Sequence, residues 1–121
     1  MIKIANYLAN KINAVALITG DSIGQVASQT LSNIRSISEN TNLPIIRPLS
    51  GYNKEDIINR AKEIGTYDIS IEPYEDCCSY FVPQHPETKA KIDRVRQLEN
   101  NLDLNDLLKE VLEKIERKEI K

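Results

Sequence analysis

Two adjacent cysteines, Cys77 and Cys78, are the residues of this chain with the most distinctive chemistry, and they end the run Pro73-Tyr74-Glu75-Asp76-Cys77-Cys78. Cysteines that are neighbours in sequence cannot link distant parts of a fold, and a reducing compartment keeps them as thiols. The carboxylates before them disfavour a thiolate, so reactivity requires a helix N-terminus or a cation such as Arg47 or Lys54. The run indicates sulfur chemistry; two small buried hydrophobic residues are the alternative.

A second candidate site is the run Gly20-Asp21-Ser22-Ile23-Gly24, which follows an apolar segment and precedes a helical pattern. Glycines let the backbone approach a ligand closely, and a helix start offers unpaired N–H groups to polar or anionic groups. In open α/β sheets, ligands bind outside the carboxyl ends of the strands. We therefore expect a nucleotide at Gly20, with Gln29, more than one turn into the helix, reading a base edge. A tight turn followed by an exposed glutamine is the alternative.

His85, the only histidine, takes part in two weaker patterns. With the G-x-S-x-G run around Ser22 it suggests a hydrolase, but the chain is too short for the usual hydrolase sheet. With Cys77 and Cys78 it suggests zinc, but a fourth ligand and the usual C-x-x-C spacing are missing. We expect no metal site.

Positive charge gathers at Lys89, Lys91, Arg94 and Arg96. Such a patch can meet RNA phosphates, although a solvated helix face is the commoner explanation. The formal net charge of -2 gives no general attraction to nucleic acid.

Apolar periodicity and end signals predict the elements that position these residues. Helices are expected around Ile4, Leu8 and Ile12; from a Ser22/Gln25 capping box to about Glu39, with Ala27, Leu31, Ile34 and Ser38 inward; from a cap at Asn53 to a stop at Gly65; from Pro86 to Asn100; and along Leu104, Leu108, Val111 and Ile115, fraying after Glu113. Strands are expected at 14–19, 43–48 and 67–71, and a loop at 73–84.

This order predicts an α/β fold with a small parallel sheet covered on both faces and two C-terminal helices. The cysteine loop and the Gly20 turn then share one edge of the sheet. Three strands leave two open edges, so we expect a larger sheet or a partner copy, as in a homodimer.

The composition, 40% hydrophobic and 28% charged over 121 residues, is that of one globular domain. No stretch approaches the roughly 18 apolar residues of a membrane span, and no signal peptide is evident. We expect a cytoplasmic protein without a membrane partner.

Several separate motifs, in order along the chain, resemble those of the tRNA 4-thiouridine synthetases, also called thiamine-biosynthesis sulfurtransferases. The motifs are Leu17-Ile18-Thr19-Gly20-Asp21-Ser22-Ile23-Gly24-Gln25-Val26-Ala27-Ser28-Gln29-Thr30, Ile46-Arg47-Pro48-Leu49, Ile64-Gly65-Thr66-Tyr67, Pro73-Tyr74-Glu75-Asp76-Cys77-Cys78 and Phe81-Val82-Pro83. The resemblance spans essentially the whole chain and is densest from Leu17 to Pro86.

The resemblance implies an ATP pyrophosphatase fold, a three-layer Rossmann-like sheet of the adenine nucleotide alpha-hydrolase type. In that family ATP, with Mg²⁺, adenylates a uridine of tRNA, and a persulfide from a cysteine desulfurase or another donor supplies sulfur; the same route serves thiazole formation for thiamine. Carried over by position, Gly20 and Gln29 line the ATP site and Cys77 attacks or relays the persulfide. Cys78 has no assigned role.

The family's Ser-Gly-Gly-x-Asp-Ser phosphate loop is absent from this sequence, as are the THUMP and rhodanese domains. The chain resembles the C-terminal half of the catalytic domain, with residues 1–85 as its α/β part and 86–121 as a helical tail. By this reasoning the isolated chain is inactive unless the missing N-terminal half is supplied. The alternative is a non-catalytic remnant or assembly fragment.

Overall fold

The computed structural model describes residues 1–26, 28–74 and 85–119. Its helices are α1 (Ile2–Lys11), α2 (Leu31–Ser38), α3 (Lys54–Glu63), α4 (Tyr67–Ser70), α6 (Ile92–Asn100) and α7 (Leu104–Glu113); its strands are β1 (Leu17–Ile18) and β2 (Ile45–Ile46). None of the helices in these ranges is long and apolar enough to cross a bilayer.

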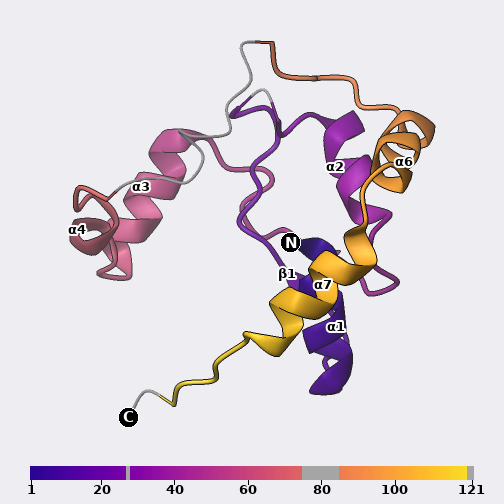
Figure 1. Cartoon of the computed structure of the whole chain (residues 1–121). Helices are drawn as coiled ribbons and strands as arrows, with labels where there is room; N and C mark the ends of the chain where they lie inside the picture. Colours follow the sequence, from indigo (N-terminus) through magenta and orange to yellow (C-terminus); the bar gives the residue numbers. More distant parts are fainter. Residues whose placement is uncertain (27, 75–84, 120–121) are drawn as a thin grey trace.

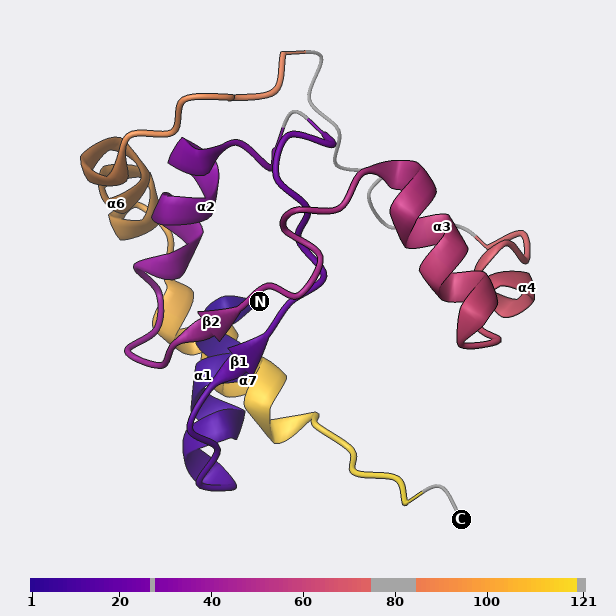
Figure 2. The same cartoon turned by 180° about the vertical axis from the view of Figure 1, so that it is seen from behind.

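The two strands pair in parallel, as the sequence predicts, with Leu17 opposite Ile45 and Ile18 opposite Ile46. The Leu17 N–H donates to the carbonyl of Pro44 at 2.9 Å, and the Thr19 N–H donates to that of Ile46 at 3.0 Å. Helices α1 and α7 lie behind this pair in Figure 2, and no described helix lies in front of it. Within the described residues the fold is therefore α/β, with a two-stranded sheet covered on one face.

The predicted third strand is wrong, because Tyr67–Ser70 forms the short helix α4. The Ser70 and Ile71 N–H groups donate to the carbonyls of Thr66 and Tyr67, at 3.0 and 3.1 Å. An extended segment needs a neighbouring strand for its backbone groups, whereas a helical turn satisfies them locally. Helix α4 packs against α3, to one side of the other elements (Figure 1).

Helix α3 follows its sequence signals closely. The Asn53 side chain accepts from the Asp56 N–H at 3.0 Å, and the Asp56 carboxylate accepts from the Asn53 N–H at 3.1 Å, a reciprocal capping box. Gly65, with φ of 72°, supplies the left-handed residue that ends the helix.

The N-cap of helix α2 lies eight residues later than predicted. Its N-cap is Thr30, whose hydroxyl accepts from the Asn33 N–H, and Ser22 caps no helix. The expected inward stripe is confirmed only in part: Ile34 and Ser38 are half-buried, but Leu31 is 67% exposed and the buried residues are Asn33 and Ser36. Ala27 lies outside the described residues. Apolar periodicity alone therefore misplaced both the start and the inner face of α2.

The two C-terminal helices are confirmed, with one change. Helix α6 begins at Ile92, after the N-cap Lys91, rather than at Pro86. The chain before it has no helical turn, because its main-chain groups bond to side chains of α2. Helix α7 ends at Glu113 and the following residues up to 119 have no regular structure, as the charged tail predicts.

The described residues form a small apolar core. Among them, Ala9 is the buried hydrophobic residue, and Ile18 and Ile46 on the strands are 73% and 51% exposed. The chain exposes 10483 Å², about 1.6 times the roughly 6,600 Å² expected of a compact monomer of 13.7 kDa. Polar contacts between segments consequently carry more of the architecture than in an ordinary domain.

Replacing Asn53 by alanine should lower the free energy of unfolding by about 1 kcal/mol, because it removes the side-chain half of the capping box. Urea titration followed by circular dichroism measures the change. Asn59→Ala, at an exposed interior position of the same helix, is the matched control and should have little effect. Equal losses in both variants would contradict the capping role.

Candidate functional site

Polar side chains meet at the carboxyl ends of β1 and β2, where Gly20 leaves the sheet. Asp21 accepts a hydrogen bond from the Thr19 hydroxyl at 2.8 Å and one from Arg47 Nε at 3.1 Å. Arg47 also donates to the Ser38 hydroxyl at 3.0 Å, linking the rim to α2. The Arg47 and Asp21 side chains are only 15% and 26% exposed, so their attraction is less screened than that of a surface pair.

These four residues, Thr19, Asp21, Ser38 and Arg47, form a rim network that holds the Gly20 turn beside Arg47, the residue that follows β2. From the sequence, Arg47 is expected only as a cation for a thiolate, and its pairing with Asp21 is not predicted. The available signal was positional: each residue follows one of two adjacent parallel strands, whose carboxyl ends lie together. Because Arg47 is already paired, Lys54 is the candidate cation that carries no such ion pair within the described residues.

A cavity of about 760 Å³ borders Gly20. Its lining is mainly apolar with a few polar groups and includes Ile2, Thr19, Asp21, Ile37, Leu104 and Leu108. Its size falls in the range of small-molecule pockets. A Cβ built on Gly20 would meet nothing within 4 Å, so packing does not require a glycine here, and the open backbone fits a site that a ligand approaches.

The turn after Gly20 folds back on itself before α2 begins. The Gly24 N–H, at a φ of 76°, donates to the Gln29 carbonyl at 3.0 Å, and the Gln29 N–H donates to the Val26 carbonyl at 2.9 Å. Gln29 therefore immediately precedes the N-cap Thr30, instead of lying more than one turn into the helix. It is half-buried and does not line the Gly20 cavity, so the structure does not bring the two predicted nucleotide residues into one pocket.

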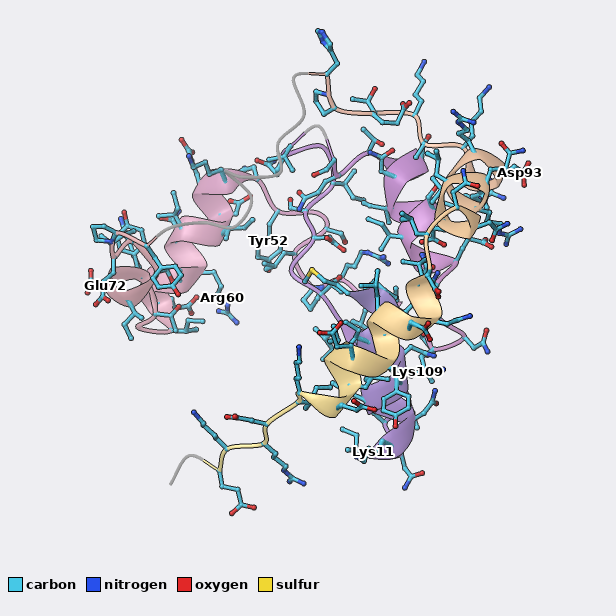
Figure 3. All side chains as sticks on the ribbon, in the orientation of Figure 1. Lys11, Tyr52, Arg60, Glu72, Asp93 and Lys109 are labelled. Carbon is cyan, nitrogen blue, oxygen red and sulfur yellow. The ribbon has the colours of Figure 1, made fainter. Side chains whose placement is uncertain are left out.

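Ser22 is a structural residue. It is 3% exposed, and its hydroxyl donates to the main-chain carbonyl of Tyr52, just before α3, at 2.7 Å; Figure 3 labels Tyr52. A hydrolase nucleophile must present its oxygen at a strand-to-helix turn, and no helix begins at this serine. The G-x-S-x-G run is therefore not a nucleophile elbow.

Cys77 and Cys78 lie outside the described residues, and their place relative to the rim network stays a prediction, as does the zinc alternative with His85. The described residues contain no group of three acidic, histidine or cysteine side chains that could hold a metal ion. The four basic residues of the predicted patch, Lys89, Lys91, Arg94 and Arg96, are all exposed. Arg96 forms an ion pair at 2.8 Å with Glu39, the residue that follows α2.

The shifted pKa of one residue, Arg60, does not indicate a functional site. The pKa of Arg60 on α3 is raised by its hydrogen bond to Glu63 and by that carboxylate's charge. Both side chains are exposed, at 55% and 66%, and Arg60 is labelled in Figure 3. An exposed pair three residues apart on a helix is a common surface feature.

The sequence of this chain is similar to that of known proteins. The family model described as thiamine biosynthesis protein (ThiI) matches residues 1–104. The chain belongs to the ThiI family. A probable tRNA sulfurtransferase of Coxiella burnetii is 53% identical over 121 residues, all of this chain, and one of Halothermothrix orenii is 50% identical over 123 residues.

A solved crystal structure is also similar to this chain. The crystal structure of a 4-thiouridine synthetase in complex with RNA and bound ATP matches with a TM-score of 0.87 and 48% identity, over 94% of this chain. The chain spans only 30% of that protein and 31% of each of the two curated relatives. The similarity to the ThiI family is therefore close and covers under a third of these relatives.

Replacing Arg47 by alanine should lower the free energy of unfolding by about 1 to 3 kcal/mol, because Asp21 would keep a poorly solvated charge. Urea titration of Arg47→Ala, Asp21→Ala and the double variant gives the coupling between the two side chains. Lys109→Ala is the control, since its pair with Asp106 is more than 70% exposed on both sides. Additive effects of the two rim substitutions would show that the ion pair does not stabilise the turn.

Proposed function

We propose that this chain is the C-terminal part of the catalytic domain of an ATP-dependent tRNA sulfurtransferase that makes 4-thiouridine. The observation that carries the proposal is the match, at 48% identity and a TM-score of 0.87, to a 4-thiouridine synthetase bound to RNA and ATP. The proposed domain is a three-layer Rossmann-like sheet, to which residues 1–85 contribute an α/β part and residues 86–121 a helical tail. Because its substrate would be tRNA, we expect it to act in the cytoplasm.

In the proposed reaction ATP activates a uridine oxygen of tRNA as an adenylate, with release of pyrophosphate. The outer sulfur of a persulfide then attacks the activated carbon and displaces AMP, and a thiolate cleaves the S–S bond, which leaves that sulfur on the uridine and a disulfide as the second product. Gly20 and Gln29 would line the ATP site. The exposed backbone at Gly20 and the mainly apolar cavity beside it suit the nucleoside end of ATP better than its phosphates. The phosphates, with Mg²⁺, would need the loop that this sequence lacks.

Cys77 is the proposed sulfur-handling residue, because a thiolate is the nucleophile that accepts or relays a persulfide. A cysteine desulfurase or another persulfide donor would supply the sulfur, and thiazole formation for thiamine is a second proposed use of it. The relatives' remaining length would supply the missing half of the site. A second copy of the chain, as in a homodimer, is the other partner proposed for the open sheet.

The second candidate is a non-catalytic remnant or assembly fragment of the same domain. Mixing the chain with the missing half and assaying tRNA thiolation separates the two: restored thiolation supports the enzyme part, and failure with several sulfur donors supports the remnant.

In the complete enzyme, Cys77→Ser should abolish formation of 4-thiouridine while adenylation, followed as tRNA-dependent release of pyrophosphate, continues. A hydroxyl cannot accept sulfur from a persulfide, but it leaves ATP binding intact. Cys78→Ser is the matched control for the neighbouring thiol. Retained 4-thiouridine in Cys77→Ser would refute the assignment of Cys77.

Replacing Gln29 by alanine should raise the KM for ATP by about tenfold, since one hydrogen bond to a base edge contributes on the order of 1 kcal/mol or slightly more. The kcat for adenylation should change less, because base contacts are made equally in the ground and transition states. Gln97→Ala, on the exposed side of α6, is the control. An unchanged KM would place Gln29 outside the nucleotide site.

A further inference from the structure

Polar side chains of α2 and of its N-cap Thr30 form hydrogen bonds with the main chain of residues 87–90. The Asn33 amide Nδ2 donates to the carbonyl of Glu87 at 2.6 Å, and Asn33 Oδ1 accepts from the N–H of Ala90 at 3.0 Å. The Thr30 hydroxyl donates to the carbonyl of Thr88 at 2.7 Å. The Ser36 hydroxyl adds a longer contact, 3.4 Å, to the carbonyl of Ala90.

These contacts form a clamp, defined here as Thr30, Asn33 and Ser36 with the main chain of 87–90. Asn33 and Ser36 are 9% and 7% exposed, and buried polar groups are costly unless they are bonded. One asparagine carboxamide offers a donor and an acceptor side by side, which matches the carbonyl and N–H that it meets. The clamp therefore satisfies main-chain groups of residues 87–90, which belong to no helix or strand.

The clamp joins parts of the chain that are 54 to 58 residues apart. On one side, Thr30 directly follows Gln29, the proposed base-reading residue, and also caps α2. On the other side, residues 87–90 lie between the cysteine motif and α6, which runs beside α2 in both views (Figures 1 and 2). The N-cap and first two turns of α2 thus contact two separate parts of the chain.

We infer that Thr30, Asn33 and Ser36 are positioning residues for the sulfur-transfer step, fixing the chain that returns from the Cys77-Cys78 motif relative to the Gln29 turn. The inference rests on the proposed function. Sulfur transfer needs the sulfur and the activated uridine brought together, and a misplacement of about 1 Å can cost about 100-fold in rate. Adenylation does not need the cysteine, so it should tolerate loss of the clamp.

The sharpest variant is Asn33→Ala in the complete enzyme. It should lower the rate of tRNA thiolation by about 10- to 100-fold and leave tRNA-dependent pyrophosphate release within about twofold. Asn33→Asp keeps the acceptor for the Ala90 N–H but sets a carboxylate oxygen against the Glu87 carbonyl, and should lower thiolation at least as much as alanine. Asn59→Ala, an exposed asparagine on α3, is the control for both.

The split between the two rates separates positioning from folding. Equal loss of both rates in Asn33→Ala and in the near-isosteric Asn33→Asp would reduce the clamp to a structural role, and unchanged thiolation would refute the inference. Retained thiolation in Cys77→Ser would instead refute the proposed function. The two failures are therefore distinguishable.

Hydrogen exchange of the 121-residue chain tests the clamp without any activity. The amide of Ala90 should exchange at least about tenfold faster in Asn33→Ala, since its acceptor is removed, and Asn59→Ala should leave it unchanged. Equal exchange at Ala90 in the parent chain and Asn33→Ala would overturn the inference whatever the enzyme assays show.

Discussion

The architecture depends on side chains that satisfy main-chain groups across long separations in sequence, because little apolar surface is buried within the described residues. Asn33 bonds to both Glu87 and Ala90, and Ser22 bonds to Tyr52 thirty residues away. A hydrogen bond contributes only about 1 kcal/mol net, but a buried partner left unsatisfied costs more. Such contacts specify which segments meet more than they stabilise the whole.

The rim network also joins segments that are distant in sequence through polar side chains. Arg47 reaches Asp21 on one side and Ser38 on the other, so one guanidinium ties β2, the Gly20 turn and α2 together. Arginine suits this place because its planar group presents several donors in fixed directions. Together, the rim network and the clamp tie α2 to the Gly20 turn and to residues 87–90, through Ser38 in the first and Asn33 and Ser36 in the second.

Features with local causes could be predicted from the sequence. The Asn53 cap, the Gly65 stop and the parallel strands each follow from a few neighbouring residues. The third strand and the start of α2 failed because the tertiary setting decided them: five alternating residues suit a strand only beside another strand, and Asn33 and Ser36 read as exposed polar positions until residues 87–90 cover them. The spacing of Thr30, Asn33 and Ser36 was the available signal of a polar inner face.

The candidate site shows the same division. Gly20 was correctly placed at the carboxyl end of β1, because strand order alone determines that edge. Gln29 was misplaced, since the start of α2 decides its position. Its carbonyl closes the turn with the Gly24 N–H, and its side chain does not line the Gly20 cavity. A ligand that touched both residues would have to extend from the cavity past this turn.

Within the described residues, the two strands leave one apolar face uncovered, beside the Gly20 turn. Ile18 and Ile46 alternate with half-buried neighbours, so their outward face is as apolar as the face that α1 and α7 cover. A parallel pair is normally buried on both faces. Where the relatives have further chain, covering this face and supplying groups beside Gly20 would be one event, since the face and Gly20 meet at the carboxyl end of β1. On the proposed function, nucleotide binding and completion of the core would then stabilise each other.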